Sequence, residues 1–248
     1  MNARTDLPEH VLAPDRADQA LGQIAVQLPG ATAVFRRLKL DFCCGGQVSL
    51  RQASAERGLD PDTVLAELSA LQRPDVAPGL TEPVALIDHI LQRYHDVHRV
   101  QLPELIRMAR RVEAVHRDHP EVPRGLAEHL EIMESELLSH MQKEELVLFP
   151  MLKAGGHPMA GQPIGMMRAE HVDHGAALAQ LLALANDATP PEGACNTWRA
   201  LYAGIAQLND DLIQHIHLEN NVLFPQFVPA PAPAPAPASA SACCGSCG

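Results

Sequence analysis

The stretch HMQKEELVLFP occupies residues 140–150, and HIHLENNVLFP follows at residues 215–225. In each stretch a histidine precedes a glutamate by four residues, and the last four residues are Val-Leu-Phe-Pro. Four residues are about one turn of an α-helix, so the His and Glu of each pair lie on the same helix face. The repeat therefore predicts two helices that present the same pair of side chains.

A row of apolar residues leads up to each pair in alternating steps of four and three, as on a helix face inside a bundle. The first row comprises Leu126, Leu130, Met133, Leu137, His140, Glu144 and Val147, and the second comprises Leu201, Ile205, Leu208, Leu212, His215, Glu219 and Val222. The His and the Glu stand where Leu is expected. Two carboxylates inside one bundle repel each other and are costly to bury unless a cation lies between them. The rows therefore predict a buried metal site.

The composition of the 248-residue chain favours an all-α fold. With 46% hydrophobic but only 3% aromatic residues, Ala, Leu, Val and Met must fill the core, which suits helices better than a β-sandwich or barrel. A formal net charge of −11 argues against nucleic acid or an anionic membrane surface as a partner. The first twenty residues lack a signal segment, and the most apolar window, residues 176–185, is much shorter than the roughly 20 residues of a membrane span. We therefore expect a cytoplasmic protein whose six cysteines are thiols or metal ligands rather than disulfides.

The composition along the chain predicts four parts. Residues 17–73 form a small helical domain that contains LDFCCGG, with helix starts at the Ser49 capping box and at Asp60-Pro61. Residues 74–83 are a Pro/Gly-rich linker, and residues 229–248 are a disordered Pro/Ala tail that ends in CCGSCG. Residues 84–228 form a bundle of four helices, at about 84–117 with a kink or break at Pro103, 124–149, 163–187 and 195–224.

The first and third helices of this bundle each offer a further ligand. His89 in LIDHILQRYHDVH and His171 in RAEHVDHGA complete a set in which each of two helical hairpins gives two His and one Glu. The predicted ligands are His89, His140, Glu144, His171, His215 and Glu219. This symmetry predicts two metal ions, each held by two imidazoles, with both carboxylates bridging and an oxide or hydroxide between the ions. Imidazole with carboxylate suits iron and the later divalent metals.

Several other histidines remain as alternatives to this set. His174 lies on the same inward row as His171 and could replace or supplement it. The others are interpreted as surface residues or as residues that surround the ligands, and mostly as surface residues: His95, His98, His116, His119, His129, His157 and His217.

Taken in order, the motifs DFCCGG, RYHD, HMQKEELVLFP and HIHLENNVLFP resemble those of the iron–sulfur cluster repair di-iron proteins, the RIC family. The resemblance covers residues 18–227, and the second domain of that family is similar to hemerythrin. It implies a non-haem di-iron centre in a four-helix bundle, ligated by the six residues named above. It also implies repair of iron–sulfur clusters damaged by nitric oxide or oxidants, so that the partners are damaged or cluster-free iron–sulfur proteins. The tail with Cys243, Cys244 and Cys247 lies outside this family pattern.

Cys43 and Cys44 match the paired cysteines of the family's first domain. Thiols near a helix start can have lowered pKa values and bind metal well. The resemblance favours transient handling of iron or sulfur, or closure of the entrance to the di-iron site, over mere packing of the cysteines. The tail cysteines suggest a second soft-metal cluster.

Three functions remain open at this point. The first is donation of iron from a labile di-iron centre. The second is an enzymatic reduction of nitric oxide to nitrous oxide, and the third is binding or sensing of dioxygen or nitric oxide. The paired cysteines favour donation over oxygen carriage, and the acidic surface is compatible with a monomer or a homodimer.

Overall fold

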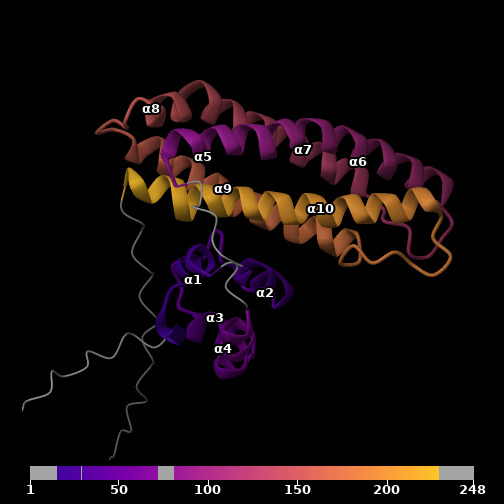
Figure 1. Cartoon of the computed structure of the whole chain (residues 1–248). Coiled ribbons are helices and arrows are strands. Elements are labelled where there is room, and N and C mark those ends of the chain that lie inside the picture. The colour runs from indigo at the N-terminus through magenta and orange to yellow at the C-terminus, as the bar shows by residue number, and fades with distance from the viewer. Residues whose placement is uncertain (1–15, 29, 72–80, 229–248) are drawn as a thin grey trace, which may run out of the picture.

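The computed structural model describes residues 16–28, 30–71 and 81–228, and within these ranges the regular elements are all helical (Figure 1). The predicted all-α fold is therefore confirmed. The Pro/Ala tail, with Cys243, Cys244 and Cys247, lies outside the described residues, as does most of the predicted linker. No helix within the described ranges combines the length and apolar character that crossing a bilayer requires.

The N-terminal module consists of a short 3₁₀ turn, η1 (Arg16–Asp18), and four small helices: α1 (Leu21–Gln27), α2 (Ala31–Arg37), α3 (Leu50–Glu56) and α4 (Pro61–Ala70). Both predicted helix starts are confirmed. The Ser49 side chain accepts a hydrogen bond from the Gln52 amide at the start of α3, and Asp60 accepts from the amides of Asp62 and Thr63 at the start of α4. These bonds satisfy amides that have no partner within the helix.

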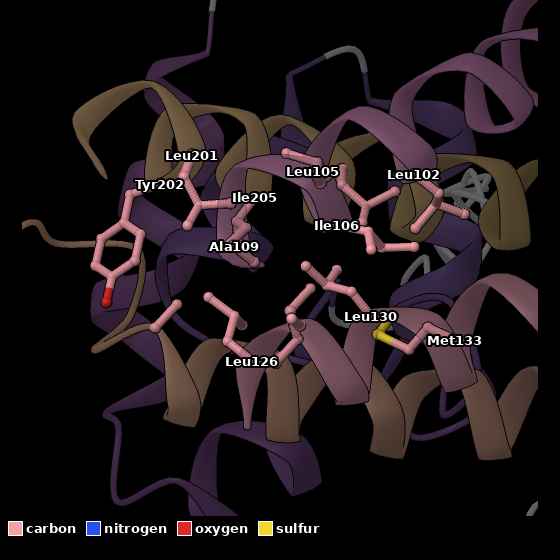
Figure 2. Packing of buried hydrophobic residues seen from close by; sticks show 14 of the residues in the cluster. Leu102, Leu105, Ile106, Ala109, Leu126, Leu130, Met133, Leu201, Tyr202 and Ile205 are labelled. Carbon is pink, nitrogen blue, oxygen red and sulfur yellow. The ribbon is translucent and has the colours of Figure 1, made fainter. Parts of the chain in front are cut away.

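The bundle contains the remaining helices in the order α5 (Pro83–Ile90), α6 (Asp96–Val115), α7 (Leu126–Lys143), α8 (Phe149–Lys153), α9 (Gly161–Leu184) and α10 (Asn196–Leu218). α6 packs against α7 and α10, and α9 packs against the same two helices. Figure 2 shows the apolar layer between α6, α7 and α10, in which Leu105, Leu130 and Ile205 lie among other buried aliphatic side chains. The N-terminal module lies along one side of the bundle (Figure 1).

Three five-residue π-helical turns interrupt the bundle helices: η2 (Leu91–His95), η3 (Glu144–Leu148) and η4 (Glu219–Leu223). In each turn an amide donates to the carbonyl five residues earlier, as Phe149 does to Glu144 and Phe224 to Glu219. Such turns are rare and are concentrated at functional sites. The predicted kink or break at Pro103 is misplaced, because α6 continues through Pro103 and the interruption lies at η2.

The repeated Val-Leu-Phe-Pro explains two of the three π turns. Pro150 and Pro225 have no amide hydrogen, so neither can donate to the carbonyl four residues earlier. The wider turn places one extra residue before the next inward position. Leu148 is therefore buried, whereas Val147 is 55% exposed, contrary to the predicted row. Leu223 replaces Val222 on the inward face of η4 in the same way.

The CCGG turn of the N-terminal module docks on the bundle beside η4. The Asn221 side chain donates to the carbonyl oxygens of Phe42 and Cys43 at 3.1 and 3.3 Å, and the Phe42 ring packs edge-on against His217 at 5.1 Å. A Cβ atom at Gly46 would lie 2.4 Å from the Phe42 carbonyl oxygen and 2.9 Å from Asn221 Oδ1. Only glycine therefore permits this approach of the turn to the bundle.

We expect Gly46→Ala to weaken this docking. The added methyl group has no room between the Phe42 carbonyl and the Asn221 side chain. The free energy of unfolding should therefore fall by about 1–3 kcal/mol, and the thiol turn should react faster with a thiol-modifying reagent. Urea unfolding and timed thiol labelling measure the two effects. Gly165→Ala is the control, because its Cβ would meet nothing within 4 Å and alanine suits a helix interior. Equal labelling rates in the two variants would contradict the docking role of Gly46.

Candidate metal centre

Two groups of four buried side chains lie next to each other inside the bundle, beside the π turns. One group contains His95, Glu144, His215 and Glu219, and the other contains His140, Glu144, His171 and Glu219. Within each group, the four potential ligand atoms all lie within 4.8 Å of one another. All six residues are at most 1% exposed. The arrangement provides two imidazoles and two carboxylate oxygens at each of two adjacent positions.

Both carboxylates are shared between the two groups, one oxygen to each. Glu144 places Oε2 at 3.3 Å from Nε2 of His95 and Oε1 at 3.4 Å from Nε2 of His140. Glu219 places Oε1 at 3.1 Å from Nε2 of His215 and Oε2 at 3.0 Å from Nε2 of His171. Each glutamate therefore spans both positions, as a bridging carboxylate does in a two-metal site.

The contacts within the cluster do not replace a cation. Both oxygens of Glu144 and Oε2 of Glu219 are fully buried and have no hydrogen bond of acceptable geometry within the described residues. The Nε2 atoms of His95 and His215 lie 3.2 Å apart, as do those of His140 and His171. Lone pairs thus converge on common points, and burying them is expensive unless a cation binds there. The residues present fit a site for two cations.

The predicted ligand His89 does not belong to this cluster, and His95 occupies the corresponding position. The inward face of α5, η2 and α6 runs through Ile90, His95 and His98. His89 is one residue before Ile90, about 100° around the helix, and is only half-buried. Its ring instead packs edge-on against Tyr94 at 5.8 Å. The structure thus brings together five of the six predicted residues and replaces the sixth.

Three of the four cluster imidazoles have an oxygen partner on Nδ1. His95 pairs with Glu145 Oε1 at 2.7 Å, His140 with Glu170 Oε2 at 2.8 Å, and His171 with Asn220 Oδ1 at 2.9 Å. Such a partner places the hydrogen on Nδ1, so that the lone pair of Nε2 faces the cluster. Glu145 also pairs with Arg99, and Glu170 with Lys143.

The two buried carboxylates titrate differently. Burial and the neighbouring charge of Glu219 raise the pKa of Glu144 to about 8. Burial also disfavours ionisation of Glu219, but His215 and His171 outweigh it and lower the pKa of that carboxyl below its usual range. Without a cation, therefore, the pair carries one negative charge near neutral pH.

The interpretation of the other histidines as mostly surface residues is wrong, because His98, His129 and His217 are buried. His174 is buried one turn after His171, but it belongs to neither group of ligand atoms. His98 is buried one turn after His95. His129 pairs with the Ala177 carbonyl at 2.8 Å and so links α7 to α9. Of the rest, His157 is exposed, and His116 and His119 pack against Trp198.

Cys43 and Cys44 lie against this centre, on the side of His171. The Cys44 thiol contacts the His171 carbonyl oxygen at 3.3 Å, and Asn220 donates to the Cys43 carbonyl at 3.1 Å while accepting from His171. Both cysteines line a cleft of about 670 Å³ between the N-terminal module, α9 and α10. With Asp41 they form a third group of ligand atoms within 4.8 Å of one another. Sequence reasoning did not anticipate Asn220 as the connection.

Comparison with known proteins agrees with this geometry. Residues 86–227 match the hemerythrin HHE cation binding domain, and residues 17–72 match ScdA_N, a domain of unknown function. The chain is 50% identical over 212 residues to the iron-sulfur cluster repair protein YtfE of Dickeya chrysanthemi, an alignment that covers 84% of this chain and 96% of the relative. YtfE of Cronobacter sakazakii is 51% identical over 211 residues, with the same coverage. The chain belongs to the YtfE family. Its bundle is thus a hemerythrin-like cation-binding domain, and the buried His/Glu cluster within it agrees with metal binding.

We expect His95→Ala and His89→Ala to differ in metal content. His95→Ala removes one of the four donors of one position, so it should lose about half of the bound metal, whereas His89→Ala should keep all of it. Metal per chain after gel filtration, measured by elemental analysis, tests this expectation. The reverse result would restore His89 as the ligand.

We expect the metal-free protein to lose stability as the pH rises. The folded-state pKa of Glu144 lies above its unfolded value, so the folded chain binds the extra proton between pH 4.5 and about 8. That stabilisation is present below this range and is lost across it, to an extent on the order of 3–5 kcal/mol. Glu144→Gln should remove most of this decline, which urea unfolding at several pH values measures. A decline of the same size in the variant would assign it to other groups.

Proposed function

We propose that the bundle holds two iron ions, one between His95 and His215 and the other between His140 and His171, bridged by Glu144 and Glu219. Iron accepts imidazole together with carboxylate. Two divalent ions against two carboxylates would leave about two positive charges by formal counting. Each position would offer an ion four donors from the chain, fewer than the six of an octahedral ion, which would leave room for a small ligand. Bound iron would supply redox and Lewis-acid chemistry at this position.

We further propose that the protein repairs iron–sulfur clusters by donating this iron, as the names of its relatives indicate for them. The observation that supports donation most directly is the contact between the thiol turn and a proposed ligand. Asn220 hydrogen-bonds His171 on one side and Cys43 on the other, at 2.9 and 3.1 Å. A thiol pair is thus fixed next to one imidazole, where it can receive an ion that leaves the bundle.

The thiol turn has the chemistry of a temporary acceptor. Contrary to the lowered pKa expected of a thiol near a helix start, the hydrogen bond with Cys44, burial and the nearby Asp41 carboxylate all raise the pKa of Cys43, so the metal-free thiol stays protonated. An arriving cation offsets these effects and displaces the protons, as metal binding to thiols generally does. Because the protons can return, the turn binds iron reversibly, which is what delivery to an iron–sulfur protein that has lost iron requires.

Reduction of nitric oxide is a second candidate function, and one feature supports it. The shared carboxylates place two cations side by side, so two nitric oxide molecules could meet within one site. Iron donation needs the thiol turn, whereas this reaction does not. The two functions therefore respond differently to loss of the cysteines.

We expect the Cys43→Ser/Cys44→Ser double variant to keep its metal but to transfer it slowly. The ions remain bound by the bundle, whereas the path to an acceptor loses its thiols, so the rate of cluster restoration in an apo iron–sulfur protein should fall roughly tenfold, as for loss of a group that supports a metal site. Aconitase-type activity of the acceptor and anaerobic nitrous oxide production should be measured on the same iron-loaded sample. Cys195→Ser is the matched control, because this thiol lies at the other end of α10.

The two readouts separate the functions. Slower restoration with unchanged nitrous oxide supports donation through the thiol turn. Unchanged restoration by the double variant contradicts that route. Nitrous oxide formation without any restoration by the wild-type protein would establish the second function instead.

A further inference from the structure

The fourth cluster imidazole, His215, differs from the other three in its surroundings. Nδ1 of His215 is buried and has no hydrogen-bond partner within the described residues, whereas Glu145, Glu170 and Asn220 serve the other three imidazoles. A ligand that binds a cation through Nε2 must carry its hydrogen on Nδ1. His215 therefore presents a donor for which the nearby protein provides no direct acceptor.

The approximate two-fold repeat of the bundle explains this difference. Glu170 directly precedes His171 and accepts from Nδ1 of His140. The equivalent residue before His95 is Tyr94, whose ring stacks flat on His215, with 5.3 Å between the ring centroids and 2° between the planes. An aromatic face cannot accept the in-plane Nδ1–H bond that the Glu170 carboxylate accepts. The partner of His215 must come from elsewhere.

His98, on α6, lies next to His215. The ring of His98 is completely buried, 5.6 Å from that of His215, and neither of its nitrogens has a hydrogen bond of acceptable geometry within the described residues. Gln101, one turn further along α6, lies near His98 and donates its amide nitrogen to the Gly204 carbonyl at 3.3 Å. Nδ1 of His215 and the ring nitrogens of His98 thus lie close together in the interior.

The hydrogen-bonding capacities of these two imidazoles are compatible with one water molecule between them. His215 offers one N–H, and the imidazole of His98 has one ring nitrogen that can donate and one that can accept. A water molecule accepts two hydrogen bonds and donates two, and buried waters commonly make about three. Leaving such groups unpaired in the interior is costly, which favours an ordered water over an empty space.

We propose that His98 and Nδ1 of His215 hold a buried water molecule between them, and that His98 positions the fourth ligand imidazole through this water. The inference rests on the proposed ligand role of His215. His98 is thus a positioning residue, since it acts on the metal through His215. Its removal should loosen the ion between His95 and His215 and leave the other ion unchanged.

The repeat also supplies a matched control. His174 follows His171 by three residues, as His98 follows His95, and it packs against His140 at 4.9 Å. It is also buried, with Nε2 unpartnered, and burial lowers its pKa to about 3. However, Nδ1 of His140 already has Glu170 as its partner. Replacing His174 therefore removes a buried imidazole, while His140 keeps Glu170 as the partner of its Nδ1.

The experiment compares His98→Leu, His98→Gln and His174→Leu in the full chain. Iron-loaded proteins are mixed with an excess of a ferrous chelator, and the release of each ion is followed over time. Proton NMR of the cobalt-loaded proteins then resolves the exchangeable Nδ1–H resonances of the ligand imidazoles. We expect His98→Leu to speed the release of one ion about tenfold, the lower end of the usual effect of a lost ligand partner, and to shift or broaden one Nδ1–H resonance. His98→Gln, which keeps a donor and an acceptor, should restore most of the slow release.

The outcomes separate this inference from the proposed ligand set. If wild-type protein binds two ions and His98→Leu resembles His174→Leu in both readouts, the positioning role is wrong although the ligands stand. If wild-type protein shows no imidazole Nδ1–H resonances, the ligand set fails, and this inference fails with it. If His98→Leu binds both ions and changes a single resonance that His98→Gln restores, a general packing defect is excluded, because packing loss is not repaired by a polar side chain.

Discussion

Two glutamates with no access to water face each other inside an apolar bundle, and this constraint shapes the surrounding structure. A carboxylate pair of this kind is unstable unless protons or cations neutralise it. Four imidazoles turn their Nε2 atoms toward Glu144 and Glu219 at 3.0–3.4 Å, which suits a cation better than a proton. Outside this ring, Glu145, Glu170 and Asn220 fix the imidazole hydrogens. The cluster therefore destabilises the metal-free bundle, and bound cations would offset this cost.

The π turns link this geometry to the chain. In a straight α-helix, inward positions recur every three or four residues. The cluster residues and the core residues that follow them do not all fit this spacing. A five-residue turn at Glu144 and at Glu219 allows the next residue to pack the core again, as Leu148 and Leu223 do. At η2 the same device brings His95 inward directly after Tyr94. Of the six cluster residues, His95, Glu144 and Glu219 therefore lie where the helix period is interrupted.

Much of this could be predicted from sequence, because the repeated His-x-x-x-Glu lies within regular apolar rows. His140, Glu144, His215 and Glu219 occupy those rows, and all four face the interior. The choice between His89 and His95 could not be made in the same way. Both have apolar neighbours at helical spacing, and no proline marks η2 as Pro150 and Pro225 mark the other two turns. The shift from Val147 to Leu148 has a visible signal in Pro150, which a row drawn with an unbroken helix period does not take into account.

The two copies of the repeat differ at positions outside the shared His and Glu. Glu145 of the first copy corresponds to Asn220 of the second. Each accepts a hydrogen bond from Nδ1 of an imidazole on the other helix of its own hairpin, Glu145 from His95 and Asn220 from His171. The next position is Leu146 in the first copy, 68% exposed, and Asn221 in the second, which binds the backbone of the thiol turn.

Gln142 likewise corresponds to His217, which packs against Phe42. The second copy therefore has the same His and Glu as the first copy, but its outer residues differ and bind the N-terminal module. An amide in place of the Glu145 carboxylate also allows Asn220 to donate to Cys43 while it accepts from His171, which a carboxylate cannot do. Asn220 thus connects the thiol turn to the metal site by hydrogen bonds, so a structural change in one affects the other.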